Sequence, residues 1–371
     1  MGIMVGLPSP SGSEKDLQLN FGKNMTVQVE MRAPHLPAEW HMQSGIQLTW
    51  PHAGTDWAYM LQEVQECFVK IAKEIAEREL LLIVTPEPEE VKKQIGTVVN
   101  MDNVRFLKCA TNDTWARDHG AITMIDTGNP SLLDFTFNGW GLKFAAELDN
   151  QITKQAVEAG ALKGQYIDCL DFVLEGGSIE SDGMGTLLTT SECLLSPQRN
   201  GKLNQVEIEE YLKSTFHLQK VLWLDHGYLA GDDTDSHIDT LARFCSTDTI
   251  AYVKCTDEAD EHYEALLAME EQLKTFRTLA GEPYRLLALP MADKIEEDGE
   301  RLPATYANFL ILNDAVLYPT YNQPENDRKA GEVLQQAFPK HQIIGIDCRA
   351  LIKQHGSLHC VTMQYPMGVL K

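Results

Sequence analysis

The chain has 371 residues, of which 43% are hydrophobic and 23% charged, a composition that supports a buried core and excludes an intrinsically disordered protein. Its 31 Lys and Arg residues stand against 54 Asp and Glu residues, which gives a formal charge of −23. This charge repels nucleic-acid phosphates and anionic lipid surfaces, so we expect neither as a partner, whereas a cationic small molecule would be attracted.

Eight cysteines are scattered along the chain without any C-x-x-C pair, a pattern typical of a reducing cytosol, and we predict a cytoplasmic location. Residues 1–7 lack the basic and apolar regions of an export signal. Residues 1–26, rich in Ser, Gly and polar side chains, are expected to form a flexible leader before the folded domain.

Short apolar segments recur at intervals of about 63 to 75 residues, and each is expected to form a strand. Apolar residues at spacings of three and four then predict a helix, as in Val64, Phe68 and Ile71, and a second strand follows each helix. In chain order the predicted strand, helix and second strand are 46–50, 60–75 and 80–84; 121–125, 144–159 and 166–174; 186–189, 205–216 and 221–224; 249–253, 263–276 and 285–289; and 315–318, 333–338 and 343–346.

Each second strand leads into a peptide rich in functional side chains. Equivalent loops of repeats arranged about one axis meet at one point. We therefore predict an α/β fold in which residues 27–371 form a single domain, a five-bladed pseudo-symmetric α/β propeller with its active site on the central axis. The five peptides are NDTWARDHG at 112–120, EGGS at 175–178, GDDTDSHID at 231–239, ATYANFL at 304–310 and HGSLHC at 355–360.

The fifth peptide offers Cys360, which precedes an alternating apolar stretch at 361–365. A lone cysteine is more often an inert buried thiol, but its place in the fifth equivalent loop makes it a candidate nucleophile. Such a thiolate needs a nearby cation or polar donors to lower its pKa.

In the third peptide His237 and Asp239 stand two residues apart, so an extended segment would place both side chains on one face. Histidine can act as general acid and base, and aspartate can bind a cation. Asp232, Asp233 and Asp235 fit an Asx-turn cluster that holds the loop. A metal site is an alternative, but no H-E-x-x-H or calcium-loop pattern is present, and we expect neither a metal nor a cofactor.

The first peptide offers Trp115 as an apolar wall and Asp118 as a cation ligand. Arg117 would alternate with Asp118 along the pleat and form a structural ion pair. The alternative for the whole peptide is a packed turn. In EGGS the two glycines would let Glu175 approach a ligand closely.

One thiol, one imidazole and two or three carboxylates are thus expected at one site. The carboxylates would suppress the thiolate by like-charge repulsion unless the substrate brings positive charge. A guanidinium is planar, permanently charged and suited to paired carboxylates, so the site predicts a small cationic guanidine as substrate.

These peptides, together with PAEW at 37–40 and LHCVTMQYP at 358–366, resemble the agmatine deiminase family of the guanidine-modifying (pentein) superfamily, which includes Porphyromonas-type peptidyl-arginine deiminases. The resemblance spans about residues 27–366 in order. It implies that Cys360 attacks the guanidinium carbon, that Asp118 and Asp239 hold its nitrogens, and that His237 transfers protons through a covalent amidino-cysteine intermediate. Agmatine would yield N-carbamoylputrescine and ammonia. Trp115 and Glu175 map near the substrate.

The sequence departs from the family pattern at His119 after the Arg-Asp pair, at Met363, and at Glu180 where a histidine is frequent. These departures leave the substrate beyond its guanidine open. Peptidyl-arginine deimination is the main alternative and amidino transfer the next, and a guanidinium- or metal-binding module without turnover is the alternative from another class. A homo-oligomer is compatible with the sequence.

Overall fold

The computed structural model describes residues 34–126 and 129–371. The chain divides into two units, residues 1–31 and 32–371. The first unit lies outside the described residues, and so do the predicted leader at 1–26 and the predicted start of the domain at residue 27. Every element named below belongs to the second unit.

Five small sheets in the described part of the chain repeat one topology. In each, a central strand pairs antiparallel with one neighbour and parallel with another, and the parallel partner follows the central strand through a helical connection. No sheet of described strands closes on itself. In the second to fifth repeats the antiparallel strand, central strand, main helix and parallel strand are β4 (Ile122–Met124), β5 (Ser131–Thr136), α5 (Ile152–Glu158) and β6 (Gln165–Val173); β7 (Ile179–Ser181), β8 (Thr186–Thr190), α7 (Gln205–Phe216) and β9 (Lys220–Leu224); β10 (Ala242–Ser246), β11 (Thr249–Lys254), α8 (Tyr263–Thr275) and β12 (Arg285–Pro290); and β15 (Leu310–Ile311), β16 (Ala315–Thr320), α9 (Pro324–Ala337) and β17 (Gln342–Asp347).

The first repeat joins the two ends of the described chain. Its central strand β1 (Gln43–Thr49) runs parallel to β2 (Leu80–Thr85), which follows α1 (Leu61–Ala76), and β2 pairs with a fourth strand, β3 (Val104–Lys108). The antiparallel partner of β1 is β18 (Thr362–Pro366), with Leu48 opposite Thr362. The last strand therefore completes the first sheet.

The remaining elements are short. None of the helices in the described ranges has both the length and the apolar character needed to cross a membrane. These elements are the helices α2 (Pro88–Ile95), α3 (Ala116–His119), α4 (Gly139–Leu142) and α6 (Ser191–Leu194); the 3₁₀ turns η1 (Asp56–Met60), η2 (Met101–Asn103), η3 (Asp149–Gln151), η4 (Gly176–Ser178), η5 (Ile238–Thr240) and η6 (Leu351–Gln354); and the hairpin β13 (Glu296–Glu297) and β14 (Glu300–Arg301).

Local sequence explains the regular elements. The run LLLIVT of β2 is almost wholly buried, as expected for a parallel strand covered on both faces. Helix α1 buries one apolar stripe that includes Val64, Phe68 and Ile71. Helix α7 begins at a capping box in which Asn204 accepts from the Glu207 backbone N–H and the Glu207 carboxylate accepts from that of Asn204.

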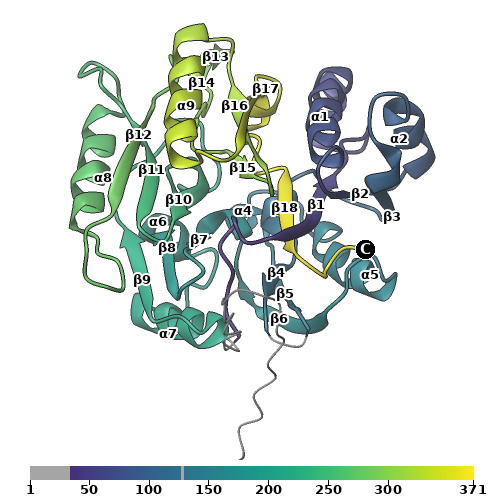
Figure 1. Cartoon of the computed structure of the whole chain (residues 1–371), viewed down its shortest axis with the longest axis horizontal. Coiled ribbons are helices and arrows are strands. Elements are labelled where there is room, and N and C mark those ends of the chain that lie inside the picture. Colours follow the sequence, from purple (N-terminus) through teal and green to yellow (C-terminus); the bar gives the residue numbers. More distant parts are fainter. Residues whose placement is uncertain (1–33, 127–128) are drawn as a thin grey trace, which may run out of the picture. The chain divides into compact units, whose positions relative to one another are not determined.

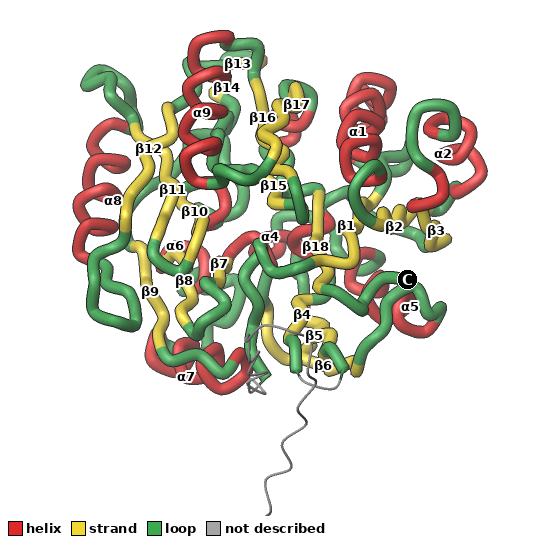
Figure 2. The backbone as a smooth tube through the Cα atoms, in the orientation of Figure 1, coloured by secondary structure: helices red, strands yellow, loops and turns green. Residues whose placement is uncertain are grey.

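The main helices lie on the outer side of the strands, and the short antiparallel strands β4, β7, β10, β15 and β18 lie toward the middle of the view (Figure 1). The loops that follow the parallel strands lead back to these inner strands (Figure 2). The predicted functional peptides occupy these loops, so the fold brings segments from five repeats to the same region.

The predicted second strands at 80–84, 166–174, 221–224, 285–289 and 343–346 are all strands, and the predicted helices at 60–75, 205–216 and 263–276 match α1, α7 and α8 within one residue. The second repeat was predicted wrongly. The segment at 121–125 forms the inner antiparallel strand β4, and the central position belongs to β5. The helix expected at 144–159 is limited to η3 and α5, because residues 143–148 form turns and irregular structure.

Candidate active site

A chamber of about 420 Å³, which includes the space open to solvent, is lined by residues from several predicted loops. Its walls are aromatic and acidic. We name it the Cys360 chamber. Its lining comprises Asp56, Asp113, Trp115, Asp118, Trp140, Phe144, Asp233, Thr234, Gln354, His355, Gly356 and Cys360.

Asp118 lies on α3 with both carboxylate oxygens held. The Trp140 indole Nε1–H donates to Oδ2 across 2.9 Å, and the Gly177 backbone N–H donates to Oδ1 across 3.1 Å. Burial and the neighbouring Asp239 charge nevertheless raise the pKa of Asp118 well above its ordinary value. A cation in the chamber would offset both effects, so Asp118 is suited to bind one.

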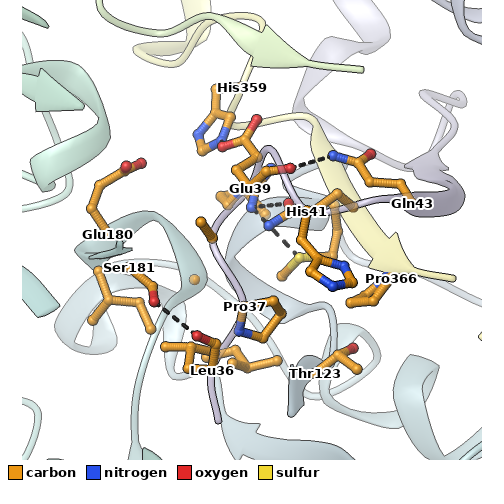
Figure 3. A pocket seen from close by; sticks show the side chains of 17 residues that line it. Leu36, Pro37, Glu39, His41, Gln43, Thr123, Glu180, Ser181, His359 and Pro366 are labelled. Atoms are coloured by element: carbon orange, nitrogen blue, oxygen red, sulfur yellow. Dashed lines mark hydrogen bonds and ion pairs between the residues drawn. The ribbon is translucent and has the colours of Figure 1, made fainter. Parts of the chain in front are cut away.

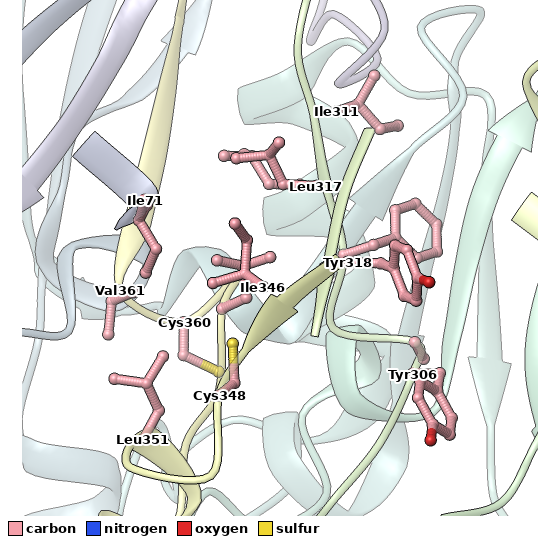
Figure 4. Packing of buried hydrophobic residues seen from close by; sticks show 14 of the residues in the cluster. Ile71, Tyr306, Ile311, Leu317, Tyr318, Ile346, Cys348, Leu351, Cys360 and Val361 are labelled. Atoms are coloured by element: carbon pink, nitrogen blue, oxygen red, sulfur yellow. The ribbon is translucent and has the colours of Figure 1, made fainter. Parts of the chain in front are cut away.

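Cys360 lies where the chain enters β18, and its neighbours anchor it. Val361 and Leu351 are fully buried beside it in the core (Figure 4). Asn308 Oδ1 accepts from the Cys360 backbone N–H across 3.3 Å and lies 3.4 Å from Sγ. The thiol also lies 3.9 Å from Asp239 Oδ2. Burial, Asp239 and Asp118 together raise the pKa of Cys360 well above its ordinary value.

Asp239 is fully buried, and its two oxygens differ. Oδ2 is hydrogen bonded to His359 Nδ1 at 2.8 Å, whereas Oδ1 has no partner among the described residues. Burial favours the neutral acid, but the hydrogen bond and charge of His359 outweigh it and lower the pKa of Asp239. The two carboxyl groups of the site are thus driven in opposite directions, Asp118 toward the acid and Asp239 toward the anion.

His237 packs against the same carboxylates. Its Nδ1 lies 3.6 Å from Asp118 Oδ1, and neither ring nitrogen has a hydrogen-bond partner among the described residues. Burial lowers the pKa of His237 to about 3 although the Asp239 charge acts in the opposite direction, so the ring is neutral near pH 7. A neutral imidazole can accept a proton.

Gly177 marks the point at which these groups converge. A Cβ atom there would lie 2.7 Å from His237 Nδ1, 2.8 Å from Asp118 Oδ1 and 3.1 Å from Asp239 Oδ2. The structure therefore brings His237, Asp118 and Asp239 together, and the 3.9 Å contact adds Cys360. His237 and Asp239 follow one another around the turn η5, which corrects the prediction of an extended segment.

Trp115 lines the chamber, and its indole Nε1–H donates to Asp113 across 2.9 Å. Glu175 is fully buried and accepts from Arg199 Nε at 2.9 and 3.1 Å, and one of its carboxylate oxygens lies within 4.8 Å of a His237 ring nitrogen. That Glu175 approaches a ligand stays a prediction. Burial raises the pKa of Glu175 against the lowering effect of Arg199.

Arg117 also differs from its predicted role. It lies on the short helix α3 rather than on a pleated strand. Its guanidinium contacts Gln364 and lies 3.7 Å from the Met363 sulfur, and no carboxylate of the described residues pairs with it. Arg117 and Asp118 line different hollows, and the expected structural ion pair of Arg117 is not found among the described residues.

Arg117 lines a second hollow, which we name the Glu39 pocket; its lining includes Glu39, Glu180, His359 and Gln364 (Figure 3). The sequence predicted no role for Glu39 of the PAEW peptide, for His359 of the HGSLHC peptide, or for Arg243, which follows GDDTDSHID. The fully buried Arg243 pairs with both Glu39 and Glu180. If Arg243 had been recognised as buried, carboxylate partners could have been predicted for it, because a buried arginine requires them.

Two groups of side chains in the described ranges have the geometry to hold a metal ion: Glu175, Cys193 and His237, and Glu39, Glu180 and His359. In each group a guanidinium already neutralises the carboxylates, Arg199 in the first and Arg243 in the second. A divalent ion would have to displace a buried cation, so the donor sets favour arginine.

Comparison with known proteins places this geometry among guanidine-modifying enzymes. Residues 35–366 match the sequence profile of the Porphyromonas-type peptidyl-arginine deiminase family. A crystal structure described as the "putative arginine deiminase" of Porphyromonas gingivalis is 51% identical, with a TM-score of 0.86, over 91% of this chain and 100% of that chain. A substrate-bound C. jejuni agmatine deiminase is 39% identical, with a TM-score of 0.84, over 94% and 100%. A Marinomonas protein named "putative agmatine deiminase" is 32% identical over 89% and 94%.

Proposed function

The chain belongs to the Porphyromonas-type peptidyl-arginine deiminase family, and on this premise we propose that it is an agmatine deiminase. As a hydrolase of guanidine C–N bonds, it would convert agmatine and water into N-carbamoylputrescine and ammonia. Cys360 is the proposed nucleophile, Asp118 and Asp239 the proposed guanidinium ligands, and His237 the proposed proton carrier.

One observation carries the proposal: the Cys360 thiol lies beside two buried carboxyl groups, 3.9 Å from Asp239, and both raise its pKa. A thiol in this position is a poor nucleophile without added positive charge. A guanidinium bound to Asp118 and Asp239 supplies that charge next to the sulfur. The site therefore favours a substrate that activates its own nucleophile.

The proposed reaction balances its protons through His237. The neutral imidazole accepts the Cys360 thiol proton, and the thiolate attacks the guanidinium carbon. The imidazolium then protonates the departing nitrogen, ammonia leaves, and an amidino-cysteine remains. His237 next removes a proton from water, whose oxygen attacks the same carbon. As the carbon–sulfur bond breaks, the His237 imidazolium returns its proton to the sulfur and restores the thiol. The ureido product gives up its extra proton, which ammonia takes to form ammonium.

The lining of the Cys360 chamber supports agmatine as the substrate. Asp56, Asp113 and Asp233 belong to this lining, and Trp115 and Trp140 provide an apolar wall for a carbon chain. Agmatine ends in a primary ammonium, which acidic side chains attract. Free arginine carries a carboxylate that these residues repel, and a peptidyl arginine lacks the ammonium.

Peptidyl-arginine or arginine deimination is the second candidate. It is favoured by the family description and by the 51% and 47% identities to structures named for arginine and peptidyl-arginine deiminases, against 39% for the C. jejuni agmatine deiminase. Amidino transfer to an amine and guanidinium binding without turnover remain further alternatives.

Ammonia release from agmatine, free arginine and an arginine peptide, measured side by side, tests the proposal. We expect agmatine to give the highest kcat/KM. Cys360→Ser should bind agmatine in calorimetry yet release no ammonia. Preference for the peptide would establish the second candidate, saturable binding without ammonia from the unmodified chain would establish a binding module, and normal turnover by Cys360→Ser would refute the mechanism.

The proposal extends to the architecture and the setting of the protein. The five repeats would be the blades of a propeller, and residues 27–371 one deiminase domain whose inner loops form the site. Trp115 would contact the substrate chain. We keep as predictions a cytoplasmic location, a possible homo-oligomer, and the lack of nucleic-acid, membrane and cofactor partners.

A further inference from the structure

The buried His359 imidazole binds one of the two carboxylate oxygens of Asp239. His359 Nδ1 lies 2.8 Å from Asp239 Oδ2, and the His359 side chain is only 2% exposed. Asp239 Oδ1 has no partner among the described residues. The ring thus engages the oxygen that also lies 3.9 Å from Cys360 Sγ, and the other oxygen stays without a partner among the described residues.

The opposite side of the same ring has two partners of different character. His359 Nε2 lies 3.0 Å from Glu39 Oε2, which can only accept when ionised, and 3.0 Å from Arg243 Nη2, which can only donate. With a proton on Nε2 the ring donates to Glu39, and without one it accepts from Arg243. In either state Nδ1–H still points to Asp239, so its bond to the carboxylate is preserved.

Arg243 fixes this arrangement from β10. It is fully buried and pairs with Glu39 and with Glu180 of β7. Its Nη1 donates to the backbone oxygens of Ala307 at 3.1 Å and Phe309 at 2.6 Å. Glu39 in turn accepts from the Ile311 backbone N–H across 2.8 Å. The residues that support the His359 ring therefore come from four repeats. They prevent the ring from rotating freely.

We propose that His359 is a positioning residue for deimination, which holds Asp239 Oδ2 through Nδ1 so that Oδ1 faces the guanidinium, while Glu39 and Arg243 orient the ring from behind. This inference rests on the proposed function. It gives a role to Glu39, which lines the Glu39 pocket, and to His359, which directly precedes the proposed nucleophile.

The charges around the ring support this assignment. Asp239 and Glu39 face His359 as carboxylates, and Arg243 faces it as a cation. Burial would favour neutral acids, but Arg243 and His359 lower the pKa of Glu39, and His359 lowers that of Asp239. Asp118 has no such hydrogen bond, since its neighbour His237 Nδ1 lies 3.6 Å from Oδ1, and burial and the Asp239 charge raise its pKa. The network accounts for the difference between the two carboxyl groups of the site.

Two substitutions of His359 separate positioning from packing. The amide nitrogen of asparagine can take the place of Nδ1, whereas that of glutamine takes the place of Nε2. His359→Asn should keep the bond to Asp239 and retain kcat/KM for agmatine within about threefold. His359→Gln should lose it and lower kcat/KM by about tenfold or more, the effect of removing a hydrogen bond to a charged group. Equal losses in both variants, or a better Gln variant, would overturn the proposal.

A matched pair of glutamates provides the control. Glu39 and Glu79 are both buried, and each accepts a backbone N–H across 2.8 Å, from Ile311 and Asn313 respectively. Only Glu39 contacts His359 and Arg243. Glu39→Gln should lower kcat/KM several-fold and Glu79→Gln should not, with thermal unfolding midpoints showing that both variants fold. Equal kinetics in the two variants would contradict the support role of Glu39.

Crystal structures of the two His359 variants separate this inference from the proposed function. They show the Asp239 rotamer without any substrate. If the unmodified protein fails to deiminate agmatine, the proposed function fails. A displaced Asp239 in His359→Gln, with an unmoved Asp239 in His359→Asn, would still support positioning. An unmoved Asp239 in both variants would refute it even in an active enzyme.

Discussion

Trp140 donates its indole N–H to Asp118 Oδ2 across 2.9 Å, which ties a residue of left-handed backbone conformation, φ 54°, to a proposed guanidinium ligand. Trp140→Phe removes this donor, and a hydrogen bond to a charged group contributes about 1.5–3 kcal/mol. We expect kcat/KM for agmatine to fall about tenfold or more.

The control for this variant is Trp223→Phe. The Trp223 indole donates to Glu209 across 2.8 Å, away from the chamber. Steady-state rates of this variant should match those of the unmodified protein. If Trp140→Phe also matches them, Asp118 does not depend on its indole donor.

Substitution by alanine should have different effects on activity and stability at the adjacent Gly176 and Gly177. At Gly177 the three atoms nearest to the added carbon belong to the side chains of His237, Asp118 and Asp239, at 2.7–3.1 Å. At Gly176 it meets the Arg117 backbone oxygen at 2.3 Å, and the backbone cannot move without disturbing α3. Gly177→Ala should therefore lose about a hundredfold or more in kcat with little change in unfolding midpoint.

Gly176→Ala is expected to lower the unfolding midpoint by several degrees, as overpacking costs about 1–3 kcal/mol. Calorimetry and ammonia release on the same preparations distinguish the two effects. The reverse pattern, an unstable Gly177→Ala with normal rates at 25 °C, would show that these side chains are not held at the reaction site.

Removing a carboxylate should make the thiol more reactive while it abolishes turnover. Asp239 is the charge that contributes most to raising the pKa of Cys360. Asp239→Asn therefore lowers that pKa, and at a fixed pH more thiolate is available for alkylation by iodoacetamide. Deimination should fall about a hundredfold or more, because the guanidinium loses a ligand.

The other seven cysteines are buried as well, and any alkylation of them adds to the signal. Subtracting the signal of the Cys360→Ser chain leaves the rate of alkylation at Cys360. Slower alkylation in Asp239→Asn than in the unmodified protein would show that Asp239 does not oppose thiolate formation.

The acidic lining of the chamber should control affinity for the ammonium end of agmatine. Asp233→Asn should raise KM about threefold or more at low salt and leave kcat nearly unchanged, because an attraction present before and during the reaction affects binding alone. Asp257→Asn, which lies outside this chamber, is the control. A change in kcat without a change in KM would place Asp233 in the chemistry instead.

Acid should destabilise the fold through buried histidines. Burial lowers the pKa of His119 to about 3, against about 6.5 in an unfolded chain. Between these values the unfolded state binds one more proton than the folded state, so His119 reduces stability as the pH falls below 6.5.

His119→Gln should abolish this pH-dependent loss of stability. The glutamine amide can keep the contact that His119 Nε2 makes with Thr49 at 3.3 Å. The stability difference between the unmodified chain and the variant should shift by about 1.4 kcal/mol per pH unit between pH 6 and pH 4, in favour of the variant. Urea unfolding across this range measures it. A difference independent of pH would mean that the buried ring is protonated in the folded state.

The sequence was sufficient to predict where the functional loops meet, because recurring strands and helices define which loops are equivalent. That equivalence brought the peptides of Cys360, Asp118, His237 and Asp239 together, and the chemistry of the side chains and the family resemblance then selected these four residues. The second strands were predicted well since each is a short apolar run that follows a helix.

Other elements lacked a local signal. The first two turns of α9, from Pro324, carry charged residues and no apolar period, so the helix was predicted only from residue 333. Strand β5 was missed because the apolar segment before it, β4, resembled a central strand equally well. Only pairing with β6 distinguishes the two.

Side-chain partners across long sequence separations were not predictable. Glu175 turns to Arg199, and Arg243 meets Glu39, which precedes it by 204 residues. No periodicity relates such positions, because each ion pair depends on the assembled fold. The buried network behind Asp239 therefore became visible only in three dimensions.

The pairing of β18 with β1 has a consequence for biosynthesis. A ribosome makes β1 long before its antiparallel neighbour, so this edge of β1 stays unpaired while all the intervening residues are synthesised. Cys360 emerges immediately before the residues that cover this edge. A product truncated upstream of it would lack the proposed nucleophile and would also expose a strand edge that favours self-association.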